Sequence, residues 1–371
     1  MMQAYAIRAQ SGRREPGTKQ VDAMSDTTLP AVSHLRHKRF VVQALSALAS
    51  STPATLAARL AAAYHPDAVW RGSHPLNEVR GTTAIAATAW LPLITSFPDL
   101  ERRDDLVLAG SYQGRHYVGA TGHHLGTFRR DFLGIPATGR AIFLRYGEMH
   151  ELVDGQIAHS SVLVDLLDLM RQARVWPLPE SLGVEGHWPA PIGRPGVLAA
   201  HEADAAEGAA NLAQTLAMHG TLGAYNAQAT EGRDGLLNMP QKLHWHPKMM
   251  WYGPAGIGTA RGLQGFVDDH QLPFRRAFPT RLGGQHYVRI GDGAFSATGG
   301  WPSVTTRHEG PFLGGGPTGR EVSMRVMDFY HHDEGLIREN WVPIDIIHLL
   351  LQMDIDVFGR MQGRFGRGAV A

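Results

Sequence analysis

Two copies of one segment lie in this chain, and this repeat constrains the fold more than any other feature of the sequence. When His65 is aligned with His246, the match runs without a gap as far as Pro98 and Pro279. The identical pairs in this window are His65/His246, Pro66/Pro247, Trp70/Trp251, Gly72/Gly253, Arg80/Arg261, Gly81/Gly262, Leu91/Leu272, Pro92/Pro273, Phe97/Phe278 and Pro98/Pro279.

A second window continues the match in a slightly shifted register, from Phe132 and Phe312 to Gln172 and Gln352. Between the windows, the tripeptide His-Tyr-Val at 116–118 recurs at 286–288. Average composition would give roughly five identities by chance over the two windows, and the observed number is several times larger. The sequence therefore predicts a tandem duplication of one domain.

The segment between the copies is too rich in proline to lie inside a helix or a strand, since it holds Pro177, Pro179, Pro189, Pro191 and Pro195. We therefore expect it to be a linker. The predicted divisions are a disordered tail over 1–30, a first domain over 31–175, the linker over 176–200, a second domain over 201–360 and a flexible tail over 361–371. Translation could start at Met1 or at Met24, and the sequence leaves both open.

Each copy begins with helical periodicity and continues with strands. In the first copy we expect helices over 35–48, 52–63 and 81–98, where apolar residues recur at helical spacing or a capping residue precedes proline. Glycine-punctuated strands are expected over 106–164, and Asp165 is expected to cap a last helix. Helices followed by an antiparallel sheet predict an α+β fold and not alternating βαβ units.

Composition excludes several classes of function. The chain has no cysteine, which rules out disulfides, cysteine-ligated metals and a cysteine nucleophile, and which fits a cytoplasmic protein. The net charge is +1 with histidines neutral, which argues against a nucleic-acid partner. No stretch approaches the roughly 20 apolar residues that a membrane span needs, so no membrane partner is expected.

The end of each copy carries Asp/Glu-Gly-x-Ile, a strand, an Asp and a helix that ends in Gln, seen as DGQIAHSSVLVDLLDLMRQ and EGLIRENWVPIDIIHLLLQM. This pattern resembles the C-terminal end of SnoaL-like (polyketide-cyclase-like) domains. His65-Pro66-Asp67, Arg80-Gly81 and Phe97-Pro98-Asp99-Leu100 are similar to that family's earlier landmarks. The resemblance covers about residues 33–173 and 205–358.

The resemblance implies that each copy is a cone, in which N-terminal helices pack on a curved antiparallel sheet around a deep, mostly apolar pocket. Founding members of the family close polyketide rings by intramolecular aldol condensation without a metal or a cofactor. Other proteins of this fold are dehydratases, isomerases, hydrolases or ligand binders, so the fold by itself does not determine the function.

Carrying over the founding cyclases' catalytic residues position by position gives a poor match. Their Asp falls on Val162 and Val342, and their Gln falls on Tyr146 and Val326. Their His falls on Glu148 in the first copy and on Asp328 in the second. The family's acid/base residue is therefore missing from both copies, and another group has to replace it if the chain is an enzyme.

We take Asp328 and Glu148 as candidate acid/base residues, with His150 on the same strand face as Glu148. A carboxylate in an apolar pocket has its charged form disfavoured, which makes it a better base near neutral pH. The alternative is that these carboxylates form structural ion pairs with Arg145, Arg325 or another basic residue.

The candidate substrate-binding residues are aromatic or polar side chains near the expected pocket, each of which could equally be structural. They are Asn340, Trp341, Tyr146, Tyr330, Trp251, Trp70, His65 and His246. Clustered histidines at 123–124, 244–246 and 331–332 lack a complete ligand set at a recognised spacing, so neither a metal nor another cofactor is expected.

Three functions remain open at this stage. The first is cofactor-free cyclase, lyase or isomerase chemistry on a small hydrophobic carbonyl compound, favoured for the second copy. The second is binding of a small hydrophobic molecule without turnover. The third is an architectural role, in which the two copies form an intramolecular pseudo-dimer.

Overall fold

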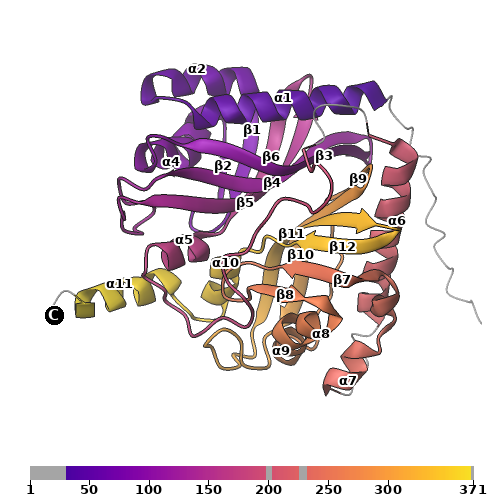
Figure 1. The fold of residues 1–371 in the computed structure, drawn as a ribbon. Coiled ribbons are helices and arrows are strands. Elements are labelled where there is room, and N and C mark those ends of the chain that lie inside the picture. Colours follow the sequence, from indigo (N-terminus) through magenta and orange to yellow (C-terminus); the bar gives the residue numbers. More distant parts are fainter. Residues whose placement is uncertain (1–30, 198–202, 225–231, 369–371) are drawn as a thin grey trace, which may run out of the picture.

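The computed structural model describes residues 31–197, 203–224 and 232–368, and shows two domains of the same construction (Figure 1). Each contains a six-stranded sheet, with strand orders β2-β1-β6-β5-β4-β3 and β8-β7-β12-β11-β10-β9. The two orders are equivalent, because each strand of the first sheet has its counterpart six strands later at the same place in the second sheet. The predicted α+β fold in two tandem copies is confirmed. The tail expected over 1–30 lies outside the described residues.

The first domain comprises α1 (Ala31–Ala49), α2 (Pro53–Ala63), β1 (Tyr64–Gly72), β2 (Glu78–Arg80), α3 (Thr82–Ile85), the π-helical turn η1 (Ala86–Trp90), α4 (Leu91–Ser96), β3 (Glu101–Tyr112), β4 (Arg115–Thr127), β5 (Ala141–Val153), β6 (Gln156–Val164) and α5 (Leu166–Gln172). The second comprises α6 (Ala205–Ala224), α7 (Gly232–Leu237), the 3-10 turn η2 (Pro240–Leu243), β7 (Trp245–Tyr252), β8 (Thr259–Arg261), α8 (Gly262–Phe266), the π-helical turn η3 (Val267–Gln271), α9 (Leu272–Ala277), β9 (Val288–Asp292), β10 (Phe295–Arg307), β11 (Glu321–Asp333), β12 (Leu336–Trp341), α10 (Ile346–Gln352) and α11 (Val357–Gly368).

Local sequence signals explain several element ends. Helix α2 begins directly after Thr52, whose backbone N–H donates to Thr55 Oγ1 at 3.0 Å, and proline occupies the first helical position. Asp165 and Asp345 cap α5 and α10, because each side chain accepts a hydrogen bond from the backbone N–H three residues later. The predicted capping role of Asp165 is confirmed, and Asp345 has the same role in the second copy.

The sheets differ in one respect from the antiparallel expectation, since β1 pairs with β6 and β7 pairs with β12 in parallel. The remaining pairs are antiparallel, and in β11 this pleat turns Asp328 and Tyr330 to one face and Met327 and Phe329 to the other. The first of these faces is covered by the domain's own helices. The second face is turned toward the other domain.

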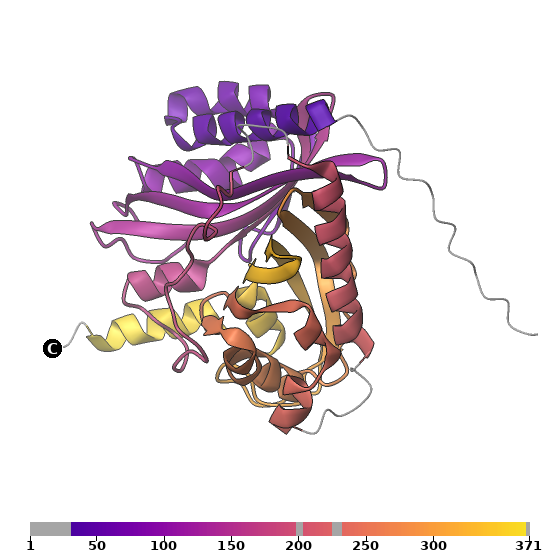
Figure 2. The same cartoon turned by 45° about the vertical axis from the view of Figure 1, so that its right-hand side comes forward.

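The two domains pack through these second faces, with α1 lying across the first sheet and α6 running along the edge of the second (Figures 1 and 2). A buried apolar cluster joins them, formed by Leu106, Leu108, Tyr117, Met149, Leu163, Trp188, Tyr252, Val288, Ile290, Ala294, Phe295, Ala297, Met327, Phe329 and Trp341. Close approach requires glycine at the contact: a side-chain carbon placed on Gly147 would lie 2.3 Å from Pro343 of the other domain.

A buried ion pair also crosses between the domains. Lys38 Nζ of α1 donates to Asp292 Oδ2 of β9 at 2.8 Å, and neither side chain is more than 7% exposed. The same oxygen accepts a hydrogen bond from the backbone N–H of Ala109 at 2.8 Å. Such a pair holds its two elements in a defined register, since breaking it would leave a buried charge unpaired.

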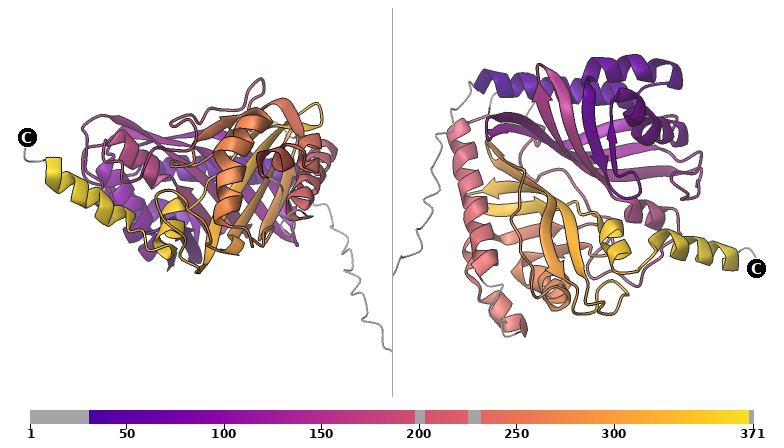
Figure 3. Two further views of the ribbon diagram at one scale, coloured as in Figure 1. Left: turned by 90° about the horizontal axis from the view of Figure 1, so that it is seen from below. Right: turned by 180° about the vertical axis from the view of Figure 1, so that it is seen from behind.

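The structure differs from two further sequence-based expectations. The His-Tyr-Val tripeptides are not equivalent: 116–118 lie in β4, whereas 286–288 lead into β9, which occupies the place of β3 in its own sheet. Where a flexible tail is expected over 361–371, α11 continues to Gly368 and extends beyond the domains beside α5 (Figure 3). Met361 near the inner end of this helix is fully buried, which explains why the helix docks.

The segment between the domains forms no helix or strand of its own over 173–197, yet it is packed against both of them. Trp188 is buried and its indole Nε1 donates to Thr121 Oγ1 of the first domain at 3.2 Å. Val184 pairs with Thr259 of the second domain.

Within the described parts of the chain no helix is long and apolar enough to cross a membrane.

Candidate functional site

The second domain holds an open cavity of about 420 Å³ between the inner face of its sheet and its helices. The lining side chains are mostly apolar or aromatic, with a few polar groups among them. They are Met218, His219, Leu222, Trp245, Trp251, Phe266, His270, Gln271, Phe274, Arg275, Arg281, Leu282, Gly283, Gly284, His286, Ser303, Val304, Met324, Val326, Asp328, Tyr330, Asn340, Val342 and Ile344. A cavity of this size and composition is typical of a small-molecule site.

Asp328 lies near the middle of β11 and is the one carboxylate among the residues that line this cavity. Its side chain is hydrogen-bonded to Tyr330 and Asn340. Tyr330 in turn shares a hydrogen bond with His219 Nε2 of α6 at 2.7 Å. The structure therefore brings together Asp328, Tyr330 and Asn340, three of the candidate residues of the sequence analysis.

Burial raises the pKa of Asp328 to about 6, and the hydrogen bonds from Tyr330 and Asn340 only partly oppose this shift. No basic group in the described part of the chain contributes to the shift. A carboxylate with such a pKa is ionised at neutral pH but accepts a proton more readily than an ordinary aspartate. The alternative that Asp328 forms a structural ion pair does not fit this geometry.

The histidines that line the cavity are neutral at physiological pH. Burial lowers the pKa of His219 and His270 to about 3, and that of His286 to about 4. His270 stacks on Trp251 with ring centroids 4.1 Å apart, and both rings line the cavity. These rings can act as hydrogen-bonding and packing groups without adding charge.

The corresponding space in the first domain is much smaller and measures about 40 Å³. Glu148 lines it and its Oε2 pairs with Arg102 of β3 at 2.8 Å, and His150 Nε2 lies 3.2 Å from the same oxygen. Although burial alone would raise the pKa of Glu148, the charge of Arg102 and the hydrogen bond from His150 lower it to about 2. Glu148 is therefore a structural ion and a poor base.

The other candidates of the first domain belong to the same packed interior. His150 Nδ1 is hydrogen-bonded to Ser160 Oγ at 2.8 Å, and Tyr146 donates its hydroxyl to Asp104 Oδ1 at 2.8 Å. Trp70 lines the small remaining space. The predictions that Glu148 and His150 act in catalysis, and that Tyr146 and Trp70 bind substrate, find no support in a space of this size.

Three further candidates lie away from both cavities. Trp341 follows Asn340 on β12, and because neighbouring strand residues face opposite sides, its ring joins the interdomain cluster and its Nε1 donates to Pro189 O at 2.9 Å. His65 and His246 each accept a hydrogen bond from the backbone N–H two residues later, through Nδ1. Their place in the structure is that of turn-forming residues, and the substrate-binding expectation for all three is corrected.

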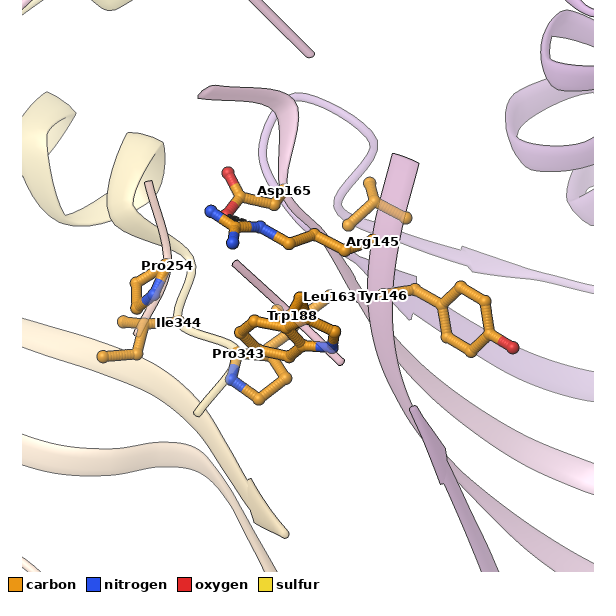
Figure 4. Close-up of a pocket in the computed structure, with 9 residues that line it drawn as sticks. Arg145, Tyr146, Leu163, Asp165, Trp188, Pro254, Pro343 and Ile344 are labelled. Carbon is orange, nitrogen blue, oxygen red and sulfur yellow. Dashed lines mark hydrogen bonds and ion pairs between the residues drawn. The ribbon is translucent and has the colours of Figure 1, made fainter. Parts of the chain in front are cut away.

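Arg145 and Arg325, considered as partners for the candidate carboxylates, pair instead with the capping residues Asp165 and Asp345. Figure 4 shows Arg145 and Asp165 side by side at the domain junction, with Pro254, Pro343 and Ile344 of the second domain facing them. The ion pairs of these arginines thus serve the contact between the domains.

Several polar residues of the second cavity escaped the sequence analysis, among them His219, His270, Arg275 and Arg281. A signal for three of them was present in the repeat. The register that pairs His65 with His246 also aligns His270 with Ala89, Arg275 with Ile94 and Arg281 with Leu100. Polar residues that replace apolar core residues in a second copy indicate a function specific to that copy.

Among the described residues, no group of three or more His, Asp or Glu side chains is arranged to hold a metal ion. The lining residues of the second cavity supply one carboxylate, neutral imidazoles and two guanidinium groups, which suit acid/base chemistry and binding of an organic molecule.

The family model described as SnoaL-like polyketide cyclase matches residues 39–173 and 240–353. Among solved structures, the chain resembles a candidate SnoaL-like polyketide cyclase from Jannaschia sp. CCS1, with 20% identity, a TM-score of 0.32 and coverage of 39% of this chain and 95% of that one. It also resembles AclR, a candidate hydroxylase from Streptomyces galilaeus, with 21% identity, a TM-score of 0.31 and coverage of 40% and 86%.

A third similar structure is wild-type IdmH, a candidate polyketide cyclase from Streptomyces antibioticus, with 21% identity, a TM-score of 0.29 and coverage of 38% of this chain and 99% of that one. No curated protein matches the chain significantly. The family match falls on both halves of the repeat, and each solved structure corresponds in length to about one of them.

Proposed function

The chain belongs to the SnoaL-like polyketide cyclase family, and from this premise we propose that its second domain carries out cofactor-free acid/base chemistry, of cyclase, isomerase or lyase type, on a small hydrophobic carbonyl compound. Asp328 is the acid/base residue in this proposal. The observation that carries it is the contrast between the two equivalent carboxylates: Glu148 is paired with Arg102 in a closed interior, whereas Asp328 has a raised pKa in an open cavity.

The reaction begins with proton transfer to Asp328. Its carboxylate removes a proton from the carbon next to a substrate carbonyl, which leaves an enolate and a neutral carboxylic acid. In a cyclisation the enolate carbon then forms a bond to a second carbonyl carbon of the same molecule, and the resulting alkoxide takes a proton. In an isomerisation the proton returns to a different carbon. Neither route needs a co-reactant, because atoms and charge balance within the substrate and Asp328.

Neighbouring groups tune this base. The hydrogen bonds from Tyr330 and Asn340 fix the orientation of the carboxylate, while the apolar wall formed by residues such as Met324 and Val326 keeps water away from it. Neutral His270 offers a donor for the enolate oxygen, since its Nδ1 is buried and has no hydrogen-bond partner among the described residues. Placing a neutral donor at the oxygen leaves Asp328 ionised and ready to accept the proton.

The proposal can be tested by proton exchange, which detects the first step without knowledge of the natural substrate. The full-length protein is incubated in D2O with 2-tetralone, a hydrophobic bicyclic ketone, and the loss of its α-protons is followed by NMR. We expect Asp328→Asn to reduce the catalysed exchange by about 100-fold or more, and Asp333→Asn, at the end of the same strand and outside the cavity lining, to leave it unchanged.

Tight binding of 2-tetralone without any catalysed exchange would contradict the proposal and support the alternative, a small-molecule-binding domain without turnover. Catalysed exchange that survives in Asp328→Asn would equally overturn the role of Asp328. Catalysis and binding without turnover would both use this cavity, so binding of 2-tetralone has to be measured separately. Quenching of the fluorescence of Trp245 and Trp251, which line the cavity, measures it.

A further inference from the structure

Basic side chains outnumber acidic ones among the residues that line the second cavity. Its lining contains two guanidinium groups, those of Arg275 and Arg281, and one carboxylate, that of Asp328. The lining histidines are neutral at physiological pH, for the reason given above. A cavity lining that is mostly apolar thus holds one more positive charge than negative charge when Asp328 is ionised.

Arg275 lies on the helical wall of the cavity, on α9. Its Nη2 is buried and has no hydrogen-bond partner among the described residues. Burial lowers the pKa of Arg275 to about 10, which leaves the guanidinium protonated at neutral pH. A buried guanidinium nitrogen without a partner costs free energy, and an acceptor on a ligand would recover it.

Arg281 lies on the segment between α9 and β9, which forms the rim of the cavity together with Leu282 and Gly283. Its guanidinium lies 5.7 Å from the centre of the Phe274 ring. Burial lowers the pKa of Arg281 to about 9, and the nearby charge of Arg275 acts in the same direction. The two guanidinium groups are therefore close enough to repel each other.

The fold does not require these arginines. In the first domain the equivalent positions are Ile94 and Leu100, which are buried members of its apolar core. A half-buried cation in place of a buried core residue destabilises the domain unless an anion compensates it, and burial alone accounts for the shifted pKa of Arg275. The position of Arg275 in the cavity wall points to a ligand that supplies this anion.

We propose that the molecule bound in this cavity carries a carboxylate, which Arg275 and Arg281 hold at the rim while the hydrophobic body of the molecule lies against the aromatic wall. This deepens the proposed function, on which it rests, by restricting the substrate class to hydrophobic carbonyl compounds with an acid group. Guanidinium groups suit this task because their paired N–H donors match the two oxygens of a carboxylate.

Binding of a matched pair of probes tests the proposal independently of turnover. The pair is 6-acetyl-2-naphthoate and its methyl ester, which share rings and ketone and differ in the charge of one group. Titration calorimetry with the full-length protein is expected to show the acid binding about tenfold tighter than the ester. Arg275→Met and Arg281→Met are expected to remove this preference while leaving the affinity for the ester within about twofold.

Arg276→Met is the matched control, because Arg276 is the neighbouring residue on α9, is exposed and does not line the cavity. This variant should keep the wild-type preference for the acid. Asp328→Asn should also keep it or increase it, since a negative charge is removed from the cavity. Equal affinity of the wild-type protein for acid and ester would overturn the proposal, as would a preference that persists in the Arg275→Met/Arg281→Met double variant.

The probe experiment separates this inference from the proposed function. A charge-dependent preference together with proton exchange that is insensitive to Asp328→Asn would retain the carboxylate site and reject Asp328 as the base. Proton exchange that depends on Asp328, without any preference for the acid probe, would retain Asp328 as the base and reject the carboxylate site. Circular dichroism of each variant confirms that the comparison is made between folded proteins.

Discussion

Asp345 of the second domain accepts a hydrogen bond through Oδ2 from the backbone N–H of His74 in the first domain, at 2.9 Å. The repeat contains the reciprocal contact: Asp165 Oδ2 accepts from the backbone N–H of Ala255 at 2.8 Å. His74 and Ala255 are themselves equivalent positions in the repeat. The two domains therefore meet through an approximately two-fold symmetric contact, in which each capping carboxylate reaches the same loop of the other copy.

We expect Asp345→Ala to lower the free energy of unfolding by about 2–4 kcal/mol, because it removes a helix cap, the ion pair with Arg325 and the bond to His74 together. Chemical denaturation with urea measures this change. Asp354→Asn is the control, since Asp354 is 63% exposed and pairs with an exposed Arg320, and asparagine tolerates the positive φ of this position, so the loss of charge should cost less than about 1 kcal/mol. Equal effects of the two substitutions would contradict the structural role given to Asp345.

The pH dependence of proton exchange should follow the ionisation of Asp328. Its raised pKa of about 6 means that the base is mostly protonated below that pH and mostly ionised above it. The rate is therefore expected to rise about tenfold per pH unit below pH 6 and to level off above it. Exchange of 2-tetralone between pH 4.5 and pH 8 gives the profile, and a rate that does not change with pH would reject Asp328 as the base.

Asp328 should also reduce the stability of the protein at high pH. Its pKa of about 6 in the folded protein lies above the value of about 3.9 in an unfolded chain, so the folded state binds the proton more tightly and loses stability as the pH rises from about 4 to 6. Asp328→Asn, which carries no charge, is expected to be more stable than the wild type by about 1–3 kcal/mol at pH 8. The difference should shrink toward pH 4.

Urea titrations at pH 4.5 and pH 8 measure this effect, with Asp333→Asn as the comparison. A variant Asp328→Asn that is less stable than the wild type at pH 8 would show that the carboxylate is structural. We expect Asp328→Asn to increase the stability of the protein and to abolish proton exchange. This combination is expected when a buried charge destabilises the fold but is needed for catalysis.

Glu148 should behave in the opposite way. Its pKa of about 2 in the folded protein lies below the value of about 4.3 in an unfolded chain, so its ionised form stabilises the protein above about pH 4.3, and this contribution is lost as the pH falls toward 2. Glu148→Gln is expected to lower the free energy of unfolding by about 2–4 kcal/mol at pH 7, because Arg102 loses a buried partner but keeps Asp104.

Proton exchange per folded molecule should be unchanged in Glu148→Gln, since the cavity of the second domain does not contain this residue. Glu151→Gln is the control: Glu151 pairs with Arg115, which is 63% exposed, and the loss should be below about 1 kcal/mol. Loss of exchange in a folded Glu148→Gln protein would show that the first domain takes part in the reaction.

The sequence alone determined the architecture of this protein. Two ungapped windows of identity established the duplication, and the order of helical and strand patterns predicted an α+β domain, because residue periodicity and capping residues such as Thr52 and Asp165 act locally. The pleat of β11 likewise followed from the sequence, which placed Asp328 and Tyr330 on one face. The parallel pairing of β1 with β6 was not visible, since it joins segments that are distant in the chain.

Only the tertiary structure decided which of the two equivalent carboxylates is available. In the first domain β3 begins at Glu101, and its long edge carries Arg102 over Glu148; in the second domain β9 begins only at Val288, and the residues before it form the rim of an open cavity. No local sequence pattern reveals an ion pair between two strands that are distant in the chain. Arg102 can reach Glu148 only because β3 extends far enough to carry it there. The repeat placed Glu148 and Asp328 at the same position, and the surrounding fold gave them opposite pKa shifts, through Arg102 in one domain and desolvation in the other.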